Sequence, residues 1–254
     1  MEISREPRLP SGEDATKAQF TQTNWSTIIE AGGSTSTEAR DALNRLCQRY
    51  WYPLYAFIRR RGIESHNAKD LTQSFFLHLL EQDFLKKIDR QKGRFRSFLL
   101  ASLTNFLNDE WRKGKAQFRG GAAQVVSIDE AEAEEKYSRL PRQEAEPSKT
   151  FDISWAATTV AEVKRKLKEE YAADPRLYEA LQPHLTGDRA EYAKLSAALG
   201  KDENAVGVSL HRMRRRFGQL LRQEIAQTVA TPAEIDDEIR YLLQAWAAGK
   251  PTSN

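Results

Sequence analysis

The chain has 254 residues, of which 40% are hydrophobic and 30% are charged, and its formal net charge is +3. This length suits one large domain or two small ones, and no apolar run approaches the roughly 18 residues that a membrane span needs. Residues 1–17 are polar and predict no signal peptide, and the single Cys47 has no partner for a disulfide. The composition therefore predicts a cytoplasmic protein that is not embedded in a membrane.

The N-terminal part begins without a folding signal and then becomes helical. Residues 1–19 are polar, contain two prolines and a glycine, and predict a disordered N-terminus. A short helix is expected over residues 24–31. The next helix starts with a capping box, Thr35 to Glu38, and its apolar residues, among them Leu46, Tyr50 and Leu54, recur at three- and four-residue steps. Pro53 lies inside this pattern and should kink or divide the helix.

Two further helices carry polar residues that are candidates for binding. The helix predicted for residues 67–82 places Asp70 and Gln73 on one face, opposite its apolar stripe. A helix that starts after Gly93 combines aromatic residues with an amide pair and a basic end; the polar candidates are Asn105, Asn108, Arg112 and Lys113. Amides read base edges and aromatic rings stack on unpaired bases, so this helix is a candidate for contact with opened DNA. Its phenylalanines are better explained as core residues.

Residues 114–150 have the composition of a linker. Glycines and prolines punctuate this stretch, and its middle, Asp129 to Glu135, is acidic, with a short helix expected over residues 130–137. Basic clusters flank it on both sides, which suggests a polyanionic partner touched at two places. Ordinary solvated helix faces are the alternative explanation of these charges. In the free protein the linker acids could lie across the arginines of the second block, and a merely soluble tether is the simpler alternative.

The second helical block contains the strongest local signal, over residues 192–217. Apolar residues on two short segments flank Gly200, the arrangement that a helix-turn-helix needs to hold its second helix in the major groove. The candidate DNA contacts are Ser209, Arg212, Arg214, Arg215 and Arg216. A helical hairpin with an arginine-rich surface is the simpler alternative.

A C-terminal extension, residues 230–254, has its own start signal at Thr231, Pro232 and Glu234. The apolar stripe that follows is expected to pack on its own domain, and a docking face for a partner is the alternative. The sequence thus predicts an all-α fold with two helical domains joined by a flexible acidic linker. The first domain covers residues 20–113, and the second, residues 151–229, contains the helix-turn-helix.

Four segments in this order resemble a bacterial sigma factor of the sigma-70 family. They are RDALNRLCQRYWYPLYAFIRRRG, NAKDLTQSFFLHLL, GRFRSFLLASLTNFLNDEWRK and, after the linker, YAKLSAALGKDENAVGVSLHRMRRRF. The two-domain layout is similar to the extracytoplasmic-function group. Gly207 and Ser209 depart from the pattern, because the family often has Lys or Arg there.

The resemblance implies a role for each part. Asp70 and Gln73 would bind the polymerase clamp, and the helix with Asn105, Asn108 and Arg112 would open DNA and read the minus-ten element. The helix-turn-helix would read the minus-thirty-five element, while the linker threads the RNA path of polymerase.

These roles predict a sigma factor whose partners are core RNA polymerase and double-stranded promoter DNA; an anti-sigma factor is a further partner that such a protein can have. The four histidines lack metal-ligand spacing, and neither a phosphate-binding glycine loop nor a nucleophile elbow occurs. We therefore expect neither an enzyme nor a cofactor. The alternative function is a helix-turn-helix regulator that acts without binding polymerase, and a third possibility is a polymerase-binding protein that has lost promoter recognition.

Overall fold

The computed structural model describes residue 25 and residues 37–80, 94–112, 129–140, 146–186 and 190–250. In these ranges the regular structure is helical, apart from one isolated β-bridge between Arg94 and Val229. The all-α class predicted from the sequence is therefore confirmed. The predicted disordered N-terminus, Lys113 and most of the predicted linker lie outside the described residues.

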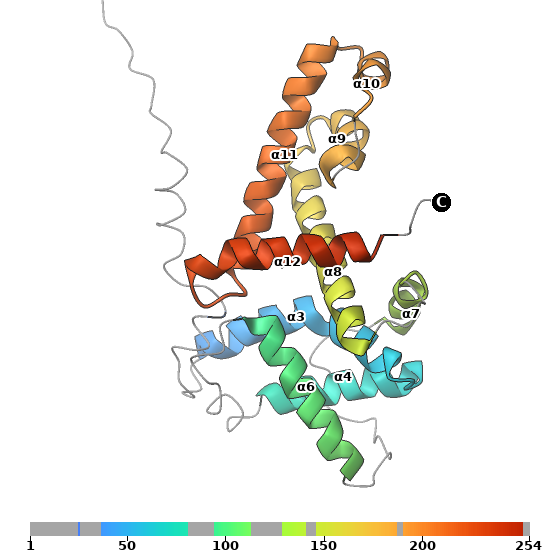
Figure 1. The fold of residues 1–254 in the computed structure, drawn as a ribbon, viewed down its shortest axis with the longest axis vertical. Helices are drawn as coiled ribbons and strands as arrows, with labels where there is room; N and C mark the ends of the chain where they lie inside the picture. Colours follow the sequence, from blue (N-terminus) through green and yellow to red (C-terminus); the bar gives the residue numbers. More distant parts are fainter. Residues whose placement is uncertain are drawn as a thin grey trace, which may run out of the picture.

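The elements follow the sequence in two groups (Figure 1). The first contains α3 (Thr37–Arg60), α4 (Ser65–Leu80) and α6 (Phe95–Arg112), followed by the short α7 (Glu130–Ser138). The second contains α8 (Pro147–Glu170), α9 (Pro175–Leu181), η1 (Gln182–Thr186), α10 (Tyr192–Leu199), α11 (Glu203–Ala226), η2 (Pro232–Glu234) and α12 (Ile235–Ala248).

Helix α3 runs through Pro53 without a break, so of the two outcomes expected from the sequence, a kink or a division, the division is wrong. A proline inside a helix removes one backbone hydrogen bond and crowds the preceding turn. Here Pro53 and its neighbours Tyr52 and Leu54 are buried, and packing on α4 and α8 holds the helix together. Tertiary packing therefore overrides the local breaker.

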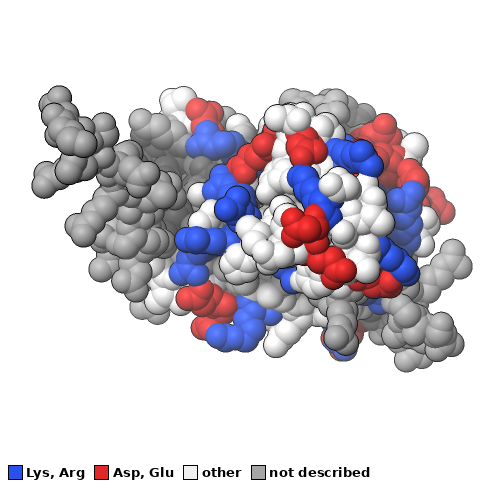
Figure 2. All heavy atoms as spheres, turned by 90° about the horizontal axis from the view of Figure 1, so that it is seen from above, with Lys and Arg blue, Asp and Glu red and all other residues white. Residues whose placement is uncertain are grey.

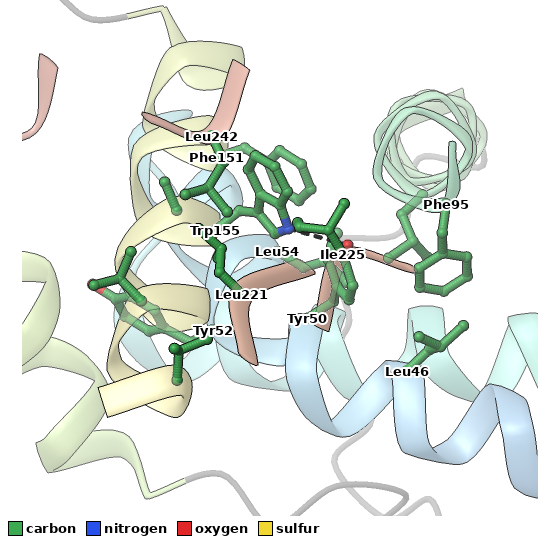
Figure 3. Close-up of a cluster of buried hydrophobic side chains, with 14 of the residues drawn as sticks. Leu46, Tyr50, Tyr52, Leu54, Phe95, Phe151, Trp155, Leu221, Ile225 and Leu242 are labelled. Carbon is green, nitrogen blue, oxygen red and sulfur yellow. Dashed lines mark hydrogen bonds between the residues drawn. The ribbon is translucent and has the colours of Figure 1, made fainter. Parts of the chain in front are cut away.

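One hydrophobic core runs through both groups of helices (Figure 3). Side chains from five helices meet in it: Leu46, Tyr50 and Leu54 of α3, Phe95 of α6, Phe151 and Trp155 of α8, Leu221 and Ile225 of α11, and Leu242 of α12. The indole Nε1–H of Trp155 donates to the hydroxyl of Tyr50 over 3.1 Å, which satisfies a polar group inside this core. Burying a large apolar side chain stabilises the fold by about 1.5–3 kcal/mol, so this shared core binds α3 firmly to α8.

Polar links reinforce the contact between the two groups. The guanidinium of Arg96, on α6, lies 2.6 Å from a carboxylate oxygen of Glu238 on α12 and 3.3 Å from one of Asp152 on α8. It also lies 3.9 Å from the ring centroid of Tyr241. The backbone N–H of Phe95 donates to the carbonyl of Thr228 over 2.9 Å. The two helical groups, expected to be joined by a linker, are thus in direct contact.

Candidate nucleic-acid interface

Helices α10 and α11 meet at a tight turn, as the sequence predicts. Gly200 ends α10 in the left-handed conformation, with φ of 63°, and its N–H donates to the carbonyl of Ser196 over 2.9 Å. Asp202 then caps α11, because its carboxylate accepts the N–H of Ala205 over 2.9 Å. Leu195 and Val206 are buried and hold the two helices together. The turn thereby fixes the direction in which α11 leaves it.

The outer face of α11 carries exposed groups that suit a nucleic acid. Asn204, Val208 and His211 recur at helical spacing along its first half, and all three are exposed. Arg212 and Arg215 follow on the same side, and within the described residues neither has a hydrogen bond or an ion pair. Figure 2 looks down on this end of the molecule and shows basic side chains interspersed with acidic ones. The free cations are therefore local, and no broad basic patch is seen on this face.

Other predicted contacts on α11 already have protein partners. The guanidinium of Arg214 donates twice to the backbone carbonyl of His184, over 2.8 and 3.0 Å. Arg216 forms a two-point ion pair with Glu170, over 2.5 and 2.8 Å. The hydroxyl of Ser209 donates to the carbonyl of Ala205 over 2.8 Å. These three side chains stabilise the block, while Arg212 and Arg215 remain available.

The C-terminal end of α6 presents the second set of candidates. Asn105 is exposed, Asn108 is half-buried, and the side chain of Arg112 is 82% exposed, with Asp109 3.7 Å away. Trp111 belongs with them: it is 52% exposed, and the guanidinium of Arg61 lies 5.0 Å from its ring centroid. An exposed ring beside amides and cations can stack on an unpaired base.

Asp70 and Gln73 share one side of α4, but neither is fully exposed. The side chain of Asp70 is 21% exposed, and His66 lies 3.7 Å from its carboxylate, one turn earlier in the helix. Gln73 is half-buried. The two side chains therefore share one face, as the sequence predicts, and both reach the surface only in part.

Helix α7 lies beside this face and pairs with the end of α3. Both Nε and Nη2 of Arg59 donate to the carboxylate of Glu134, over 2.7 and 2.8 Å, and this hydrogen bonding holds the pKa of Glu134 below its ordinary value. Glu130 accepts a hydrogen bond from the hydroxyl of Ser65 over 2.7 Å. The possible pairing of these acids with the arginines of the second block is therefore not seen for Glu130 and Glu134, whose partners lie on α3 and α4.

The described residues contain no group of three or more His, Cys, Asp or Glu side chains that could hold a metal ion. None of the helices in the described ranges is long and apolar enough to cross a membrane.

Comparison with known families identifies one part of the chain. Residues 46–117 match the family model described as Sigma-70 region 2. No curated protein and no solved structure matches the chain. The matched residues include most of α3, all of α4 and α6, and the polar side chains predicted on α4 and α6. The match shows that this part of the chain is similar to region 2 of the sigma-70 factors, and it covers less than a third of the chain.

Proposed function

We propose that this protein is a sigma factor of the extracytoplasmic-function group, acting in the cytoplasm with core RNA polymerase and double-stranded promoter DNA as partners. The observation that carries the proposal is the match over residues 46–117, because it spans α4, with the predicted polymerase contacts, and α6, with the predicted contacts with opened DNA. An anti-sigma factor would be a further partner. The sequence-based division into residues 20–113, 114–150 and 151–229 describes its functional parts.

In this proposal α4 and α6, both within residues 20–113, have different binding partners. Asp70 and Gln73 contact the polymerase clamp. Asn105, Asn108 and Arg112 contact opened DNA, with Lys113 continuing the basic end. Amide groups suit the edges of unpaired bases, whereas a guanidinium suits phosphate.

Helix α11 contacts duplex DNA at the minus-thirty-five element. Asn204 and Val208 occupy the first turns of this helix, where helix-turn-helix proteins contact base edges. An asparagine amide can pair with adenine, and an apolar side chain can contact the methyl group of thymine. Arg212 and Arg215 then neutralise flanking phosphates.

The test of the proposal begins with binding to core RNA polymerase from the source organism. Wild-type protein should bind the core enzyme and direct run-off transcription from genomic fragments that the resulting holoenzyme selects. Asp70→Lys should weaken core binding about tenfold or more without changing circular dichroism, because it reverses a charge at the contact. Wild-type protein that binds DNA but never binds polymerase would favour the regulator instead.

A second experiment separates the two DNA contacts. Asn105→Ala should reduce promoter opening, measured by permanganate reactivity of unpaired thymines, more than it reduces duplex binding. Arg212→Ala should reduce duplex binding and its dependence on salt, because each lost phosphate contact removes counterion release. Equal losses of opening and duplex binding in both variants would contradict this division.

A further inference from the structure

Helix α7 covers the corner where α3 ends and α4 begins. Two of its carboxylates face this corner: Glu134 pairs with Arg59 and accepts a hydrogen bond from the hydroxyl of Tyr55 over 2.5 Å, while Glu130 binds Ser65. His66 lies 4.0 Å from Glu130 and 3.7 Å from Asp70. Through His66, α7 reaches the face of α4 assigned above to polymerase.

An aromatic contact adds to the polar ones. The half-buried ring of Tyr137, near the end of α7, has the guanidinium of Arg59 5.0 Å and that of Arg60 5.6 Å from its centroid. In turn, the ammonium of Lys136 lies 5.8 Å from the ring centroid of Trp51 on α3. Cation–π contacts of this kind are weak when they remain partly hydrated.

The contacts that anchor α7 to α3 and α4 are few and partly exposed, so α7 can detach reversibly. Among its residues only Ala133 is fully buried. The anchoring carboxylates of Glu130 and Glu134 are each 34% exposed, so solvent and salt screen their attraction. A helix of nine residues is marginal without tertiary contacts. Losing these few contacts would therefore release α7 and leave the large core intact.

We propose that α7 is an intramolecular lid over the α3–α4 corner, and that core RNA polymerase must displace it to bind α4. The lid lowers the affinity of the free protein for polymerase. This inference rests on the proposed function, because it takes the face with Asp70 as the polymerase contact.

Helix α7 supplies its own control, because its other two glutamates form ion pairs with neighbours in sequence and, within the described residues, not with α3 or α4. Glu132 pairs with Lys136 and Glu135 pairs with Arg139, both within the segment itself. Glu130→Gln with Glu134→Gln removes the carboxylates that face the corner. Glu132→Gln with Glu135→Gln makes the same change in net charge on the same helix but leaves the contacts of Glu130 and Glu134 with Ser65, Tyr55 and Arg59 in place.

The experiment uses the full chain and measures two quantities for each form. Hydrogen exchange of the α7 amides reports whether the lid is held, and titration with core polymerase reports affinity. The corner-facing double variant should exchange faster in α7 and bind polymerase about three- to tenfold tighter, with the gain shrinking as salt rises. The control pair should match wild type in polymerase affinity.

A further variant approaches the lid from its buried side. Ala133→Gln puts a larger polar group at the fully buried position of α7, and should raise polymerase affinity in the same direction without altering any charge. Circular dichroism confirms that each variant retains its helices.

The following results would contradict the proposal that α7 acts as a lid. Unchanged exchange in the corner-facing variant means that these carboxylates do not hold α7. Faster exchange with unchanged or weaker polymerase binding means that α7 does not compete with polymerase. Failure of the wild-type protein and of every variant to bind polymerase instead overturns the proposed function, and the lid with it.

Discussion

Replacing Arg96 by methionine should destabilise the folded protein by about 3 kcal/mol, because the buried carboxylate of Glu238 loses its closest cation. The side chain of Glu238 is 1% exposed, and Arg96, itself 10% exposed, is its nearest cation. Removing one member of a buried pair costs about 3–5 kcal/mol, since the remaining charge has lost both its partner and its water. Arg94 stays 3.3 Å from Glu238, which places the expected cost at the low end.

Two further variants separate the stranded charge from lost packing. Arg96→Met combined with Glu238→Leu removes both charges, and apolar replacement of a buried pair is often neutral or stabilising. We therefore expect the double variant to be more stable than Arg96→Met, although Asp152, 3.3 Å from Arg96, also loses this cation. Arg240→Met breaks a pair with Asp237 in which both side chains are more than half exposed, and should cost about 0.5 kcal/mol or less.

Urea denaturation followed by far-ultraviolet circular dichroism measures all three variants, with the free energy of unfolding taken from the midpoint and slope. Equal losses for Arg96→Met and Arg240→Met would refute the claim that burial makes the first pair special. A double variant as unstable as the single would show that the cost comes from packing around Arg96, including its contact with Tyr241, and not from the charge left on Glu238.

Three other outcomes are expected. Arg215→Ala should reduce the slope of log binding constant against log salt concentration, for duplex binding, by about one. Arg214→Ala should leave this slope unchanged and lower thermal stability, because the guanidinium of Arg214 binds the carbonyl of His184. Equal slopes for the two variants would contradict this assignment. Gly200→Ala should lower the free energy of unfolding, measured by urea denaturation, by about 1 kcal/mol, because a residue with a Cβ is strained at φ of 63° although the space around it is open. An unchanged urea midpoint would argue against a left-handed conformation at this turn. Cys47 should react with a thiol reagent only as the protein unfolds, since burial raises the pKa of its thiol and the thiolate is the reactive form; rapid labelling of the native protein would show that the core around it opens.

The residue pattern was enough to predict the helices and much of the core. The apolar spacing along α3 predicted that Leu46, Tyr50 and Leu54 lie inside, and they are buried. A period of about 3.6 residues marks the inner face of a helix without knowledge of its neighbours. Turn chemistry was equally local: Gly200 ends α10, and Thr231 with Glu234 forms the capping box ahead of α12.

The candidate sites were only partly predictable. The sequence places Arg212, Arg214, Arg215 and Arg216 together as one basic run. Helical geometry, however, turns them to different sides, so that Arg214 reaches η1 and Arg216 reaches α8. The exposure of Asn204 also depends on how α11 packs against its neighbours. The sequence around Asn204 does not specify which side of α11 faces solvent.

Contacts between distant segments were decided by the tertiary structure alone. From the sequence, Glu238 would be expected at the surface, because it is charged and lies beside an apolar stripe. In the structure it is buried against Arg96, 142 residues earlier in the chain. In the same way, Glu134 of α7 pairs with Arg59 of α3 and not with an arginine of α11. Local periodicity specifies which face of a helix is apolar, because that depends on neighbours three and four residues away. The partner of a charged side chain depends on how whole helices pack, and a buried charge finds its counterion only once the shared core has brought the two elements together.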